Sequence, residues 1–250
     1  MLITTSEIIE QSLDNYARTW RKFAPLMAIL IAIVALRYVI GIGGIFLNAD
    51  TKLSTALIDL VSAILLFGLF FIGFWTSIVA TKNSAILYTQ GSLSTLKKSF
   101  LDTKKYLLPI IGVSILYAII CMVGSVLLLL PGLIFGIWYY LATFAVIFDN
   151  NKILESLKTS KNLVIGRWWS MAFRIVTPKI LLVIALVIIK MLCLTALNQI
   201  FKPSDIQYEM MIQIINGIVT ALTLPIFIWT DTLLYFSAKE NPLQPITTIK

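Results

Sequence analysis

Long apolar segments separated by short polar joints run along the whole chain, and this pattern predicts helices that cross a membrane. A crossing helix needs roughly 20 apolar residues, and in lipid its backbone must pair its own polar groups. Five segments meet this requirement directly: Pro25 to Phe46, Leu57 to Ala80, Leu107 to Leu130, Leu133 to Phe148 and Ile212 to Tyr235. A sixth, Pro178 to Leu197, contains two lysines but is otherwise apolar. The pattern predicts an all-α polytopic fold with six transmembrane helices.

The third and fourth predicted spans share one apolar run from Leu107 to Phe148, about twice as long as one crossing requires. The chain must therefore reverse direction within this run. Pro131 cannot continue the helical hydrogen-bond ladder, and Gly132 adopts the dihedral angles of a reversal without strain. We predict a tight hairpin at Pro131–Gly132. The alternative is a single helix kinked at Pro131.

Three amphipathic stretches with a 3.6-residue period precede the pairs of spans. Thr4 and Glu7 have the spacing of a capping box at the start of the first stretch. The predicted apolar stripes are Ile9, Leu13, Tyr16, Trp20 and Phe23, then Leu93, Leu96 and Phe100, then Ile153, Leu154, Leu157 and Val164. We predict interfacial helices here, within a single integral membrane domain over residues 1–250. The recurrence also suggests a threefold repeat over residues 4–80, 92–148 and 151–238.

Lysine and arginine gather at alternate joints, which predicts the orientation of the spans. One side holds Arg18, Arg21, Lys22, Lys82, Lys97, Lys98, Lys104, Lys105, Lys152, Lys158, Lys161, Arg167, Arg174, Lys239 and Lys250, and the other holds Lys52 and Lys202. Both termini are therefore expected in the cytoplasm, together with the interfacial helices. External loops are expected at Asn48–Ala56, at Pro131 and at Asn198–Met211.

The composition supports a membrane protein and narrows its chemistry. The chain is 59% hydrophobic and 13% charged, with a mean hydropathy of +0.92 and a net charge of +8. The basic residues are spread over the joints instead of forming one face, so we expect anionic membrane lipids as partners and no nucleic acid. The chain lacks histidine, and Cys121 and Cys193 lie in apolar segments. No metal, no cofactor and no catalytic residues are expected.

Clusters of basic and aromatic residues at the ends of the amphipathic stretches are the candidate lipid interface. These residues are Trp20, Arg21, Lys22, Lys97, Lys98, Lys104, Lys105, Lys158, Lys161, Arg167, Trp168 and Trp169. They are equally explained as ordinary connectors whose positive charges fix the topology, and spacing does not separate the two interpretations.

Five charged residues lie inside the predicted spans, where charge is costly and by default suggests function. Arg37, Asp59 and Lys190 are placed to meet at a similar depth, as are Lys179 and Asp231. They form either a polar pathway or structural ion pairs, and we favour the pairs. The neighbouring Trp138, Tyr139 and Tyr140 are interpreted as packing and membrane-interface residues.

One motif resembles a known family. Leu130-Pro131-Gly132 precedes an aromatic-rich span, followed by Glu155-Ser156-Leu157-x-x-Ser160-x-x-Leu163-x-x-Gly166-x-Trp168. This resembles the YciC-like bacterial membrane proteins and the related membrane region of some glycerophosphodiester phosphodiesterases, although Ser156 replaces the usual alanine. The resemblance implies a six-span protein of the bacterial inner membrane. It implies no enzyme activity, because those phosphodiesterases carry their catalytic residues in a separate soluble domain.

The leading hypothesis is a non-enzymatic protein with an organising or envelope-maintenance role. Its basic cytoplasmic helices would engage anionic lipids or a membrane-protein partner. The alternative is a transporter or lipid-handling permease that uses Arg37, Asp59, Lys190 and Asp231. A membrane-embedded hydrolase is disfavoured, because the acidic residues lack paired spacing.

Overall fold

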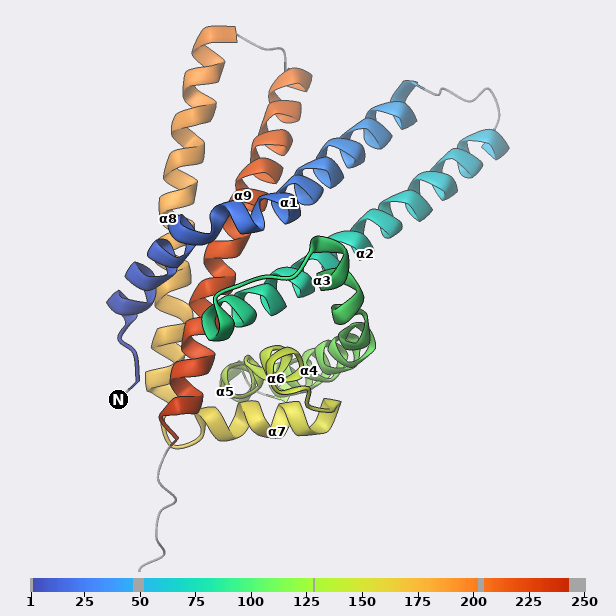
Figure 1. Cartoon of the computed structure of the whole chain (residues 1–250). Helices are drawn as coiled ribbons and strands as arrows, with labels where there is room; N and C mark the ends of the chain where they lie inside the picture. The colour runs from blue at the N-terminus through green and yellow to red at the C-terminus, as the bar shows by residue number, and fades with distance from the viewer. Residues whose placement is uncertain (1, 47–51, 128, 202–204, 243–250) are drawn as a thin grey trace, which may run out of the picture. The chain divides into compact units, whose positions relative to one another are not determined.

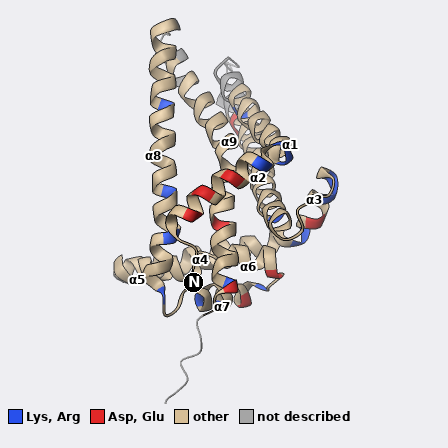
Figure 2. Ribbon diagram, turned by 60° about the vertical axis from the view of Figure 1, so that its left-hand side comes forward, with Lys and Arg blue, Asp and Glu red and all other residues tan. Residues whose placement is uncertain are grey.

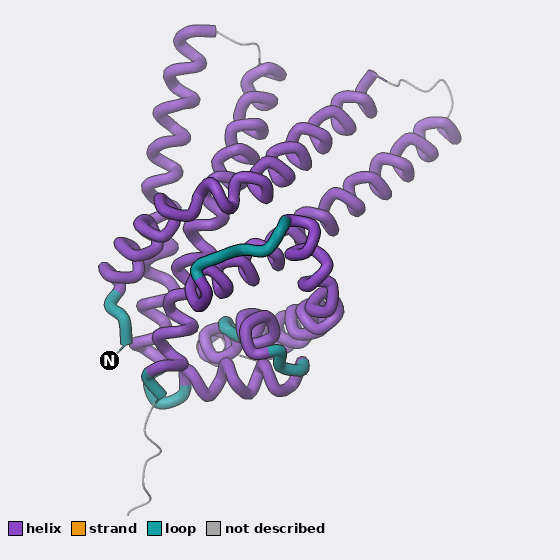
Figure 3. Tube along the Cα trace, viewed as in Figure 1, coloured by secondary structure: helices purple, strands orange, loops and turns teal. Residues whose placement is uncertain are grey.

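The computed structural model describes residues 2–46, 52–127, 129–201 and 205–242, and in these ranges it contains helices and no strand (Figure 3). The elements are α1 (Thr5–Phe46), α2 (Lys52–Gln90), α3 (Leu96–Thr103), the 3₁₀ helix η1 (Lys104–Tyr106), α4 (Leu107–Leu127), α5 (Leu129–Tyr139), α6 (Ala142–Asp149), α7 (Ile153–Val164), α8 (Trp168–Phe201) and α9 (Asp205–Glu240). Six stretches are long and apolar enough to span a membrane, with α5 and α6 forming the fourth. The predicted all-α polytopic fold with six spans is confirmed.

The helices contribute to two compact units. Unit 1 comprises residues 1–19, 78–181 and 225–250, and unit 2 comprises residues 20–77 and 182–224. The borders of the units do not coincide with those of the predicted threefold repeat. The single domain and the repeat stay predictions.

Four of the helices extend well beyond their predicted spans. α1 begins with the predicted capping box, in which the Thr4 amide donates to Glu7 Oε2 (2.8 Å) and the Glu7 amide to Thr4 Oγ1 (3.3 Å). It then runs unbroken for 42 residues, so the first amphipathic stretch and the first span are one helix. The apolar segments predict only the part of each helix that lies in hydrocarbon. Polar residues at either end form the same backbone hydrogen bonds, so the helices continue beyond those segments. Of the predicted external loops, residues 47–51 and 202–204 lie outside the described residues, and helix occupies most of the rest.

The predicted position of the hairpin between the third and fourth spans is wrong. α4 ends at Leu127 and α5 begins at Leu129, so Pro131 and Gly132 lie in the first turn of α5. A proline is tolerated there because the first amides of a helix have no intrahelical acceptor. Gly132 instead allows close packing: a Cβ added to it would lie 3.0 Å from the Cα of Ser125 on α4.

Unit 1 has a well-packed core. Its buried cluster combines residues from the start of α1 and from α6, α7, α8 and α9, namely Ile8, Leu141, Ala145, Val164, Met171, Ile175, Leu234, Tyr235 and Ala238. α7 contacts α4, α5 and α6 (Figure 1). Polar links supplement the apolar packing: Ser84 bonds Thr232 (2.7 Å), and Asp149 accepts from both Tyr235 (2.8 Å) and Lys239 (2.6 Å).

Unit 2 is an assembly of long helices with little buried interior. One close contact joins α9 to α1, where a Cβ added to Gly217 would lie 2.7 Å from Val34 Cγ2. Large apolar side chains point outward on α2, including Ile64, Phe67 and Phe70. Outward apolar surface of this extent fits helices whose solvent is lipid.

Replacing Gly132 by alanine is expected to destabilise the contact between α4 and α5. Overpacking costs about 1–3 kcal/mol, which exceeds the gain of about 1 kcal/mol from replacing a helical glycine. Gly136→Ala on the same helix is the matched control, because its added Cβ would meet only Tyr117 Oη at 3.8 Å. Thermal unfolding in a neutral detergent measures both variants. Equal stability of the two would contradict the close packing.

Candidate functional site

The fourth span is interrupted in its middle. α5 ends at Tyr139 and α6 begins at Ala142, with Tyr140 and Leu141 in a turn between them. Ser160 of α7 lies against this turn: its hydroxyl donates to the carbonyl of Trp138 (2.7 Å) and accepts from the amide of Leu141 (3.1 Å). A single side chain thus pairs two backbone groups at the break. Unpaired, each would cost several kcal/mol at membrane depth.

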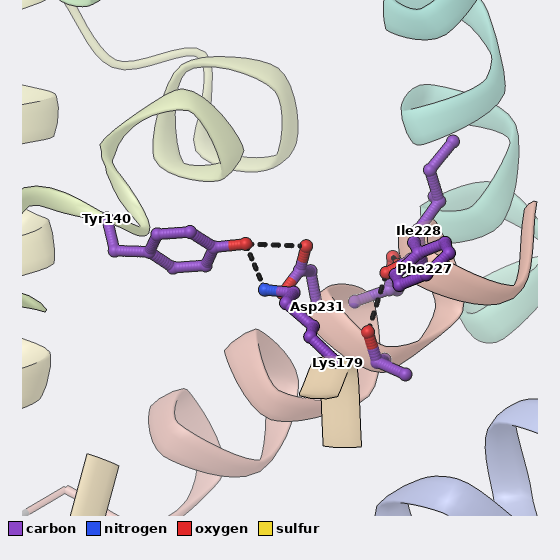
Figure 4. Close-up of polar contacts among 7 residues, drawn as sticks. Tyr140, Lys179, Phe227, Ile228 and Asp231 are labelled. Atoms are coloured by element: carbon purple, nitrogen blue, oxygen red, sulfur yellow. Dashed lines mark hydrogen bonds and ion pairs between the residues drawn. The ribbon is translucent and has the colours of Figure 1, made fainter. Parts of the chain in front are cut away.

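The turn directs Tyr140 onto a buried ion pair. Lys179 Nζ of α8 lies 2.6 Å from Asp231 Oδ1 of α9, and the Tyr140 hydroxyl donates to Asp231 Oδ2 (2.9 Å). Lys179 also donates to the Tyr140 oxygen, so the three polar groups contact one another (Figure 4). The side chains of Lys179 and Asp231 are only 23% and 11% exposed. The predicted Lys179–Asp231 pair is confirmed, and Tyr140 is its third member instead of the packing residue we expected.

A cavity of about 350 Å³ adjoins this cluster. Its lining consists of Val113, Ser114, Tyr117, Tyr139, Tyr140, Thr143, Phe144 and Asp231. The lining is therefore mostly aromatic and hydroxyl-bearing, with one carboxylate. Lys179 is not itself a lining residue, but it contacts two of them, Tyr140 and Asp231.

The other three intramembrane charges do not form a site with one another. Arg37, Asp59 and Lys190 belong to unit 2, and within the described ranges no ion pair joins any two of them. Arg37 and Asp59 are exposed and Lys190 is half-exposed. The expected meeting of these three charges is therefore not seen among the described residues.

Part of the predicted lipid interface instead stabilises unit 1. Lys105 donates to Asn150 Oδ1 (3.0 Å), and Lys161 lies 4.7 Å from the ring centre of Trp138. Arg167 donates to the carbonyls of Ala238 (2.8 Å), Asn241 (2.6 Å) and Leu163 (2.8 Å), and Trp168 donates to that of Ile134 (3.3 Å). Burial, and then the charge of Arg174, lowers the pKa of Arg167, but a guanidinium keeps its proton at physiological pH. These four residues bind a side-chain amide oxygen, an aromatic ring and backbone carbonyls within unit 1.

The rest of the predicted interface points outward. It consists of Trp20, Arg21, Lys22, Lys97, Lys98, Lys104, Lys158 and Trp169. Trp20 is 45% and Trp169 68% exposed, and the Arg21 guanidinium lies 5.6 Å from the Trp20 ring centre. Basic residues follow one another along the α3 segment (Figure 2).

The buried faces of the amphipathic helices differ from the predicted apolar stripes. Ser12, Ser99 and Ser160 are buried, whereas Leu13 and Leu154 are 44% and 73% exposed. Small hydroxyl side chains allow helices to approach closely, and Ser12 pairs its hydroxyl with the Ile8 carbonyl of its own helix. Leucine faces outward at no cost where the surroundings are apolar. Hydrophobicity alone therefore assigned Leu13 and Leu154 wrongly, whereas Phe23, Leu157 and Val164 of the predicted stripes are buried.

The motif that resembles the YciC-like proteins holds α7 in place. Glu155 accepts a hydrogen bond from the backbone amide of Lys152 at the start of the helix (3.4 Å), and Leu157 is buried. Ser160 bonds the backbone at the interruption of the fourth span. Gly166 has a φ of +80°, which favours glycine, directly after α7. The serines at 156 and 160, spaced by four on the apolar side of a helix, are the signal that would have indicated a close contact.

No protein-family model, curated protein or solved structure matches this chain. The resemblance to the YciC-like proteins therefore rests on the motif.

Replacing Ser160 by alanine is expected to destabilise the protein by roughly 1–3 kcal/mol, because the Leu141 amide and Trp138 carbonyl lose their partner. Ser156→Ala is the matched control: Ser156 is equally buried, but its hydroxyl donates to the Ile153 carbonyl of its own helix (2.7 Å). Thermal unfolding in detergent should show a loss for the first variant and little change for the second. Similar behaviour of the two would count against the role of Ser160.

Replacing Lys179 by methionine is expected to cost roughly 3–5 kcal/mol, because it leaves the buried Asp231 carboxylate without its cation. Lys190→Met, on the same helix, should have little effect. Adding Asp231→Asn to Lys179→Met should restore part of the lost stability by removing the uncompensated charge. The unfolding temperatures of the four proteins test this. A single Lys179 variant as stable as the Lys190 variant would show that the pair is not a stabilising interaction.

Proposed function

We propose that this chain is a non-enzymatic, multi-pass protein of the bacterial inner membrane with an organising or envelope-maintenance role. It binds anionic lipid through the outward basic residues of its short helices, with both termini in the cytoplasm as the distribution of lysine and arginine predicts. A membrane-protein partner bound at the same surface belongs to the proposal.

The observation that carries the proposal is the outward face of α3 and the start of η1. Lys97, Leu101 and Lys104 follow one another at helical spacing; both lysines are exposed and Leu101 is 60% exposed. Lys98 is exposed beside them, and the opposite face holds the buried Ser99 and Thr103. A leucine between lysines suits the headgroup boundary, where the apolar chain enters the acyl region and each ammonium meets a phosphate.

The other short helix has a similar outward face. On α7, Leu154 is 73% exposed, and Lys158 lies exposed one turn further along. The inward face of α7 is bonded to unit 1 through Ser160. The proposed lipid-binding surface therefore consists only of basic residues that are exposed on the short helices of unit 1.

The second candidate function is a transporter or lipid-handling permease. One observation favours it: Asp231 lines a cavity of about 350 Å³ beside an interrupted span, an arrangement that transporters use for their substrates. Arg37, Asp59 and Lys190 give it no support, because they form no common site among the described residues.

Removing the α3 charges is expected to abolish the preference for anionic lipid. Each lysine contributes about 1 kcal/mol near an anionic surface, so Lys97→Gln/Lys98→Gln should weaken phosphatidylglycerol binding about tenfold or more. Binding of phosphatidylglycerol and phosphatidylcholine to the delipidated full chain in maltoside detergent is measured by native mass spectrometry. Arg37→Gln/Lys190→Gln is the control, because it removes the same charge elsewhere. Equal affinities in the two double variants would contradict the proposal.

A further inference from the structure

The cavity beside Asp231 brings a carboxylate, several aromatic rings and free volume together. We propose that it binds an organic ammonium group. The inference deepens the second candidate function by naming its ligand class, but binding does not require transport, and it is independent of the anionic-lipid surface.

The lining chemistry selects a cation. Tyr117, Tyr139 and Phe144 provide aromatic rings, whose faces attract ammonium groups, and Asp231 provides a carboxylate. The Tyr140 ring already has Lys179 Nζ 4.1 Å from its centre. None of the lining residues is basic, so a phosphate or carboxylate would meet only negative and neutral groups. A purely apolar molecule would use neither the hydroxyls of Ser114 and Thr143 nor the remaining lone pairs of Asp231.

The Asp231 carboxylate retains capacity for a further partner. It accepts one hydrogen bond from Lys179 and one from Tyr140, and a carboxylate has about four lone-pair positions. Lys179 balances the charge of the carboxylate through Oδ1, at 2.6 Å. An ammonium entering from the cavity side is thus bound by the remaining lone pairs and the rings.

Two of the rings are fixed in advance. The Tyr117 hydroxyl donates to the carbonyl of Gly136 on α5 (3.2 Å), and the Tyr140 hydroxyl is held on Asp231. Tyrosines anchored at their hydroxyls keep their rings in place, so little ordering is required when a ligand binds. Ser160 contributes indirectly by fixing the turn that carries Tyr140.

The size and the opening fit a headgroup-sized ligand. About 350 Å³ lies at the lower end of small-molecule sites, and Ser114 in the lining is exposed, so the cavity opens on that side of α4. The ammonium could belong to a free amine or to the headgroup of a lipid such as phosphatidylethanolamine. The two sources share the same chemistry, and the experiment distinguishes them.

The test is a binding titration of the full chain in maltoside detergent without anionic lipid. The free-amine arm uses choline and its neutral isostere 3,3-dimethylbutan-1-ol; the lipid arm uses lysophosphatidylethanolamine and the matching lysophosphatidylglycerol. Choline or lysophosphatidylethanolamine should bind at least tenfold more tightly than its comparison compound. The arm that shows this preference identifies the source.

Variants then test whether the ammonium group binds in the cavity beside Asp231. Asp231→Asn should weaken ammonium binding at least tenfold and Tyr117→Leu about fivefold, whereas Tyr38→Leu in unit 2 should leave it unchanged. Tyr117 lies outside the ion cluster, so its variant remains informative if Asp231→Asn fails to fold. The proposal is overturned if neither ammonium ligand binds, if the isostere binds as tightly as choline, or if Tyr117→Leu binds as the native chain does. Anionic-lipid binding is measured separately and does not depend on these results.

Discussion

The hydrogen bonds of Ser160 are the interaction on which the candidate site depends. In hydrocarbon a helix can be interrupted only where another group pairs the freed amide and carbonyl. Ser160 does this for Leu141 and Trp138, and α7 can supply the hydroxyl because Leu157 and Val164 anchor the helix in unit 1. The interruption turns Tyr140 toward Asp231 and places the surrounding aromatic residues around a cavity. A short helix that sequence patterns assign to the membrane surface therefore determines the geometry of the interior of unit 1.

Charge is used in two different ways in this molecule. In unit 1, Lys179, Lys105, Lys161 and Arg167 are bound to a carboxylate, an amide oxygen, an aromatic ring and backbone carbonyls. On α3 the lysines face outward beside Leu101. The first group stabilises the protein, and the second is available to lipid headgroups.

The sequence predicts the parts of the fold that depend on composition over long windows. Six spans, the all-α class, the capping box at Thr4 and Glu7, and the Lys179–Asp231 pair all follow from hydropathy, spacing and depth. The position of the reversal between α4 and α5 does not, because Pro131 is equally compatible with a turn and with the first turn of a helix. The interruption at Tyr140 has no local signal, since nothing in Trp138-Tyr139-Tyr140-Leu141 opposes helix. Its cause is a serine 20 residues further along the chain. The buried helix faces were missed because they carry serine and threonine where a hydrophobicity pattern expects leucine.

The most direct test of this account is hydrogen–deuterium exchange at the Leu141 amide, compared between the native chain and the Ser160→Ala variant. We expect slow exchange in the native chain and markedly faster exchange in the variant, with the amides in the middle of α5 unchanged, because the partner of Leu141 is the Ser160 hydroxyl. Equal protection of Leu141 in both proteins would mean that its amide bonds within a continuous helix. The interrupted span, and the site built on it, would then be wrong.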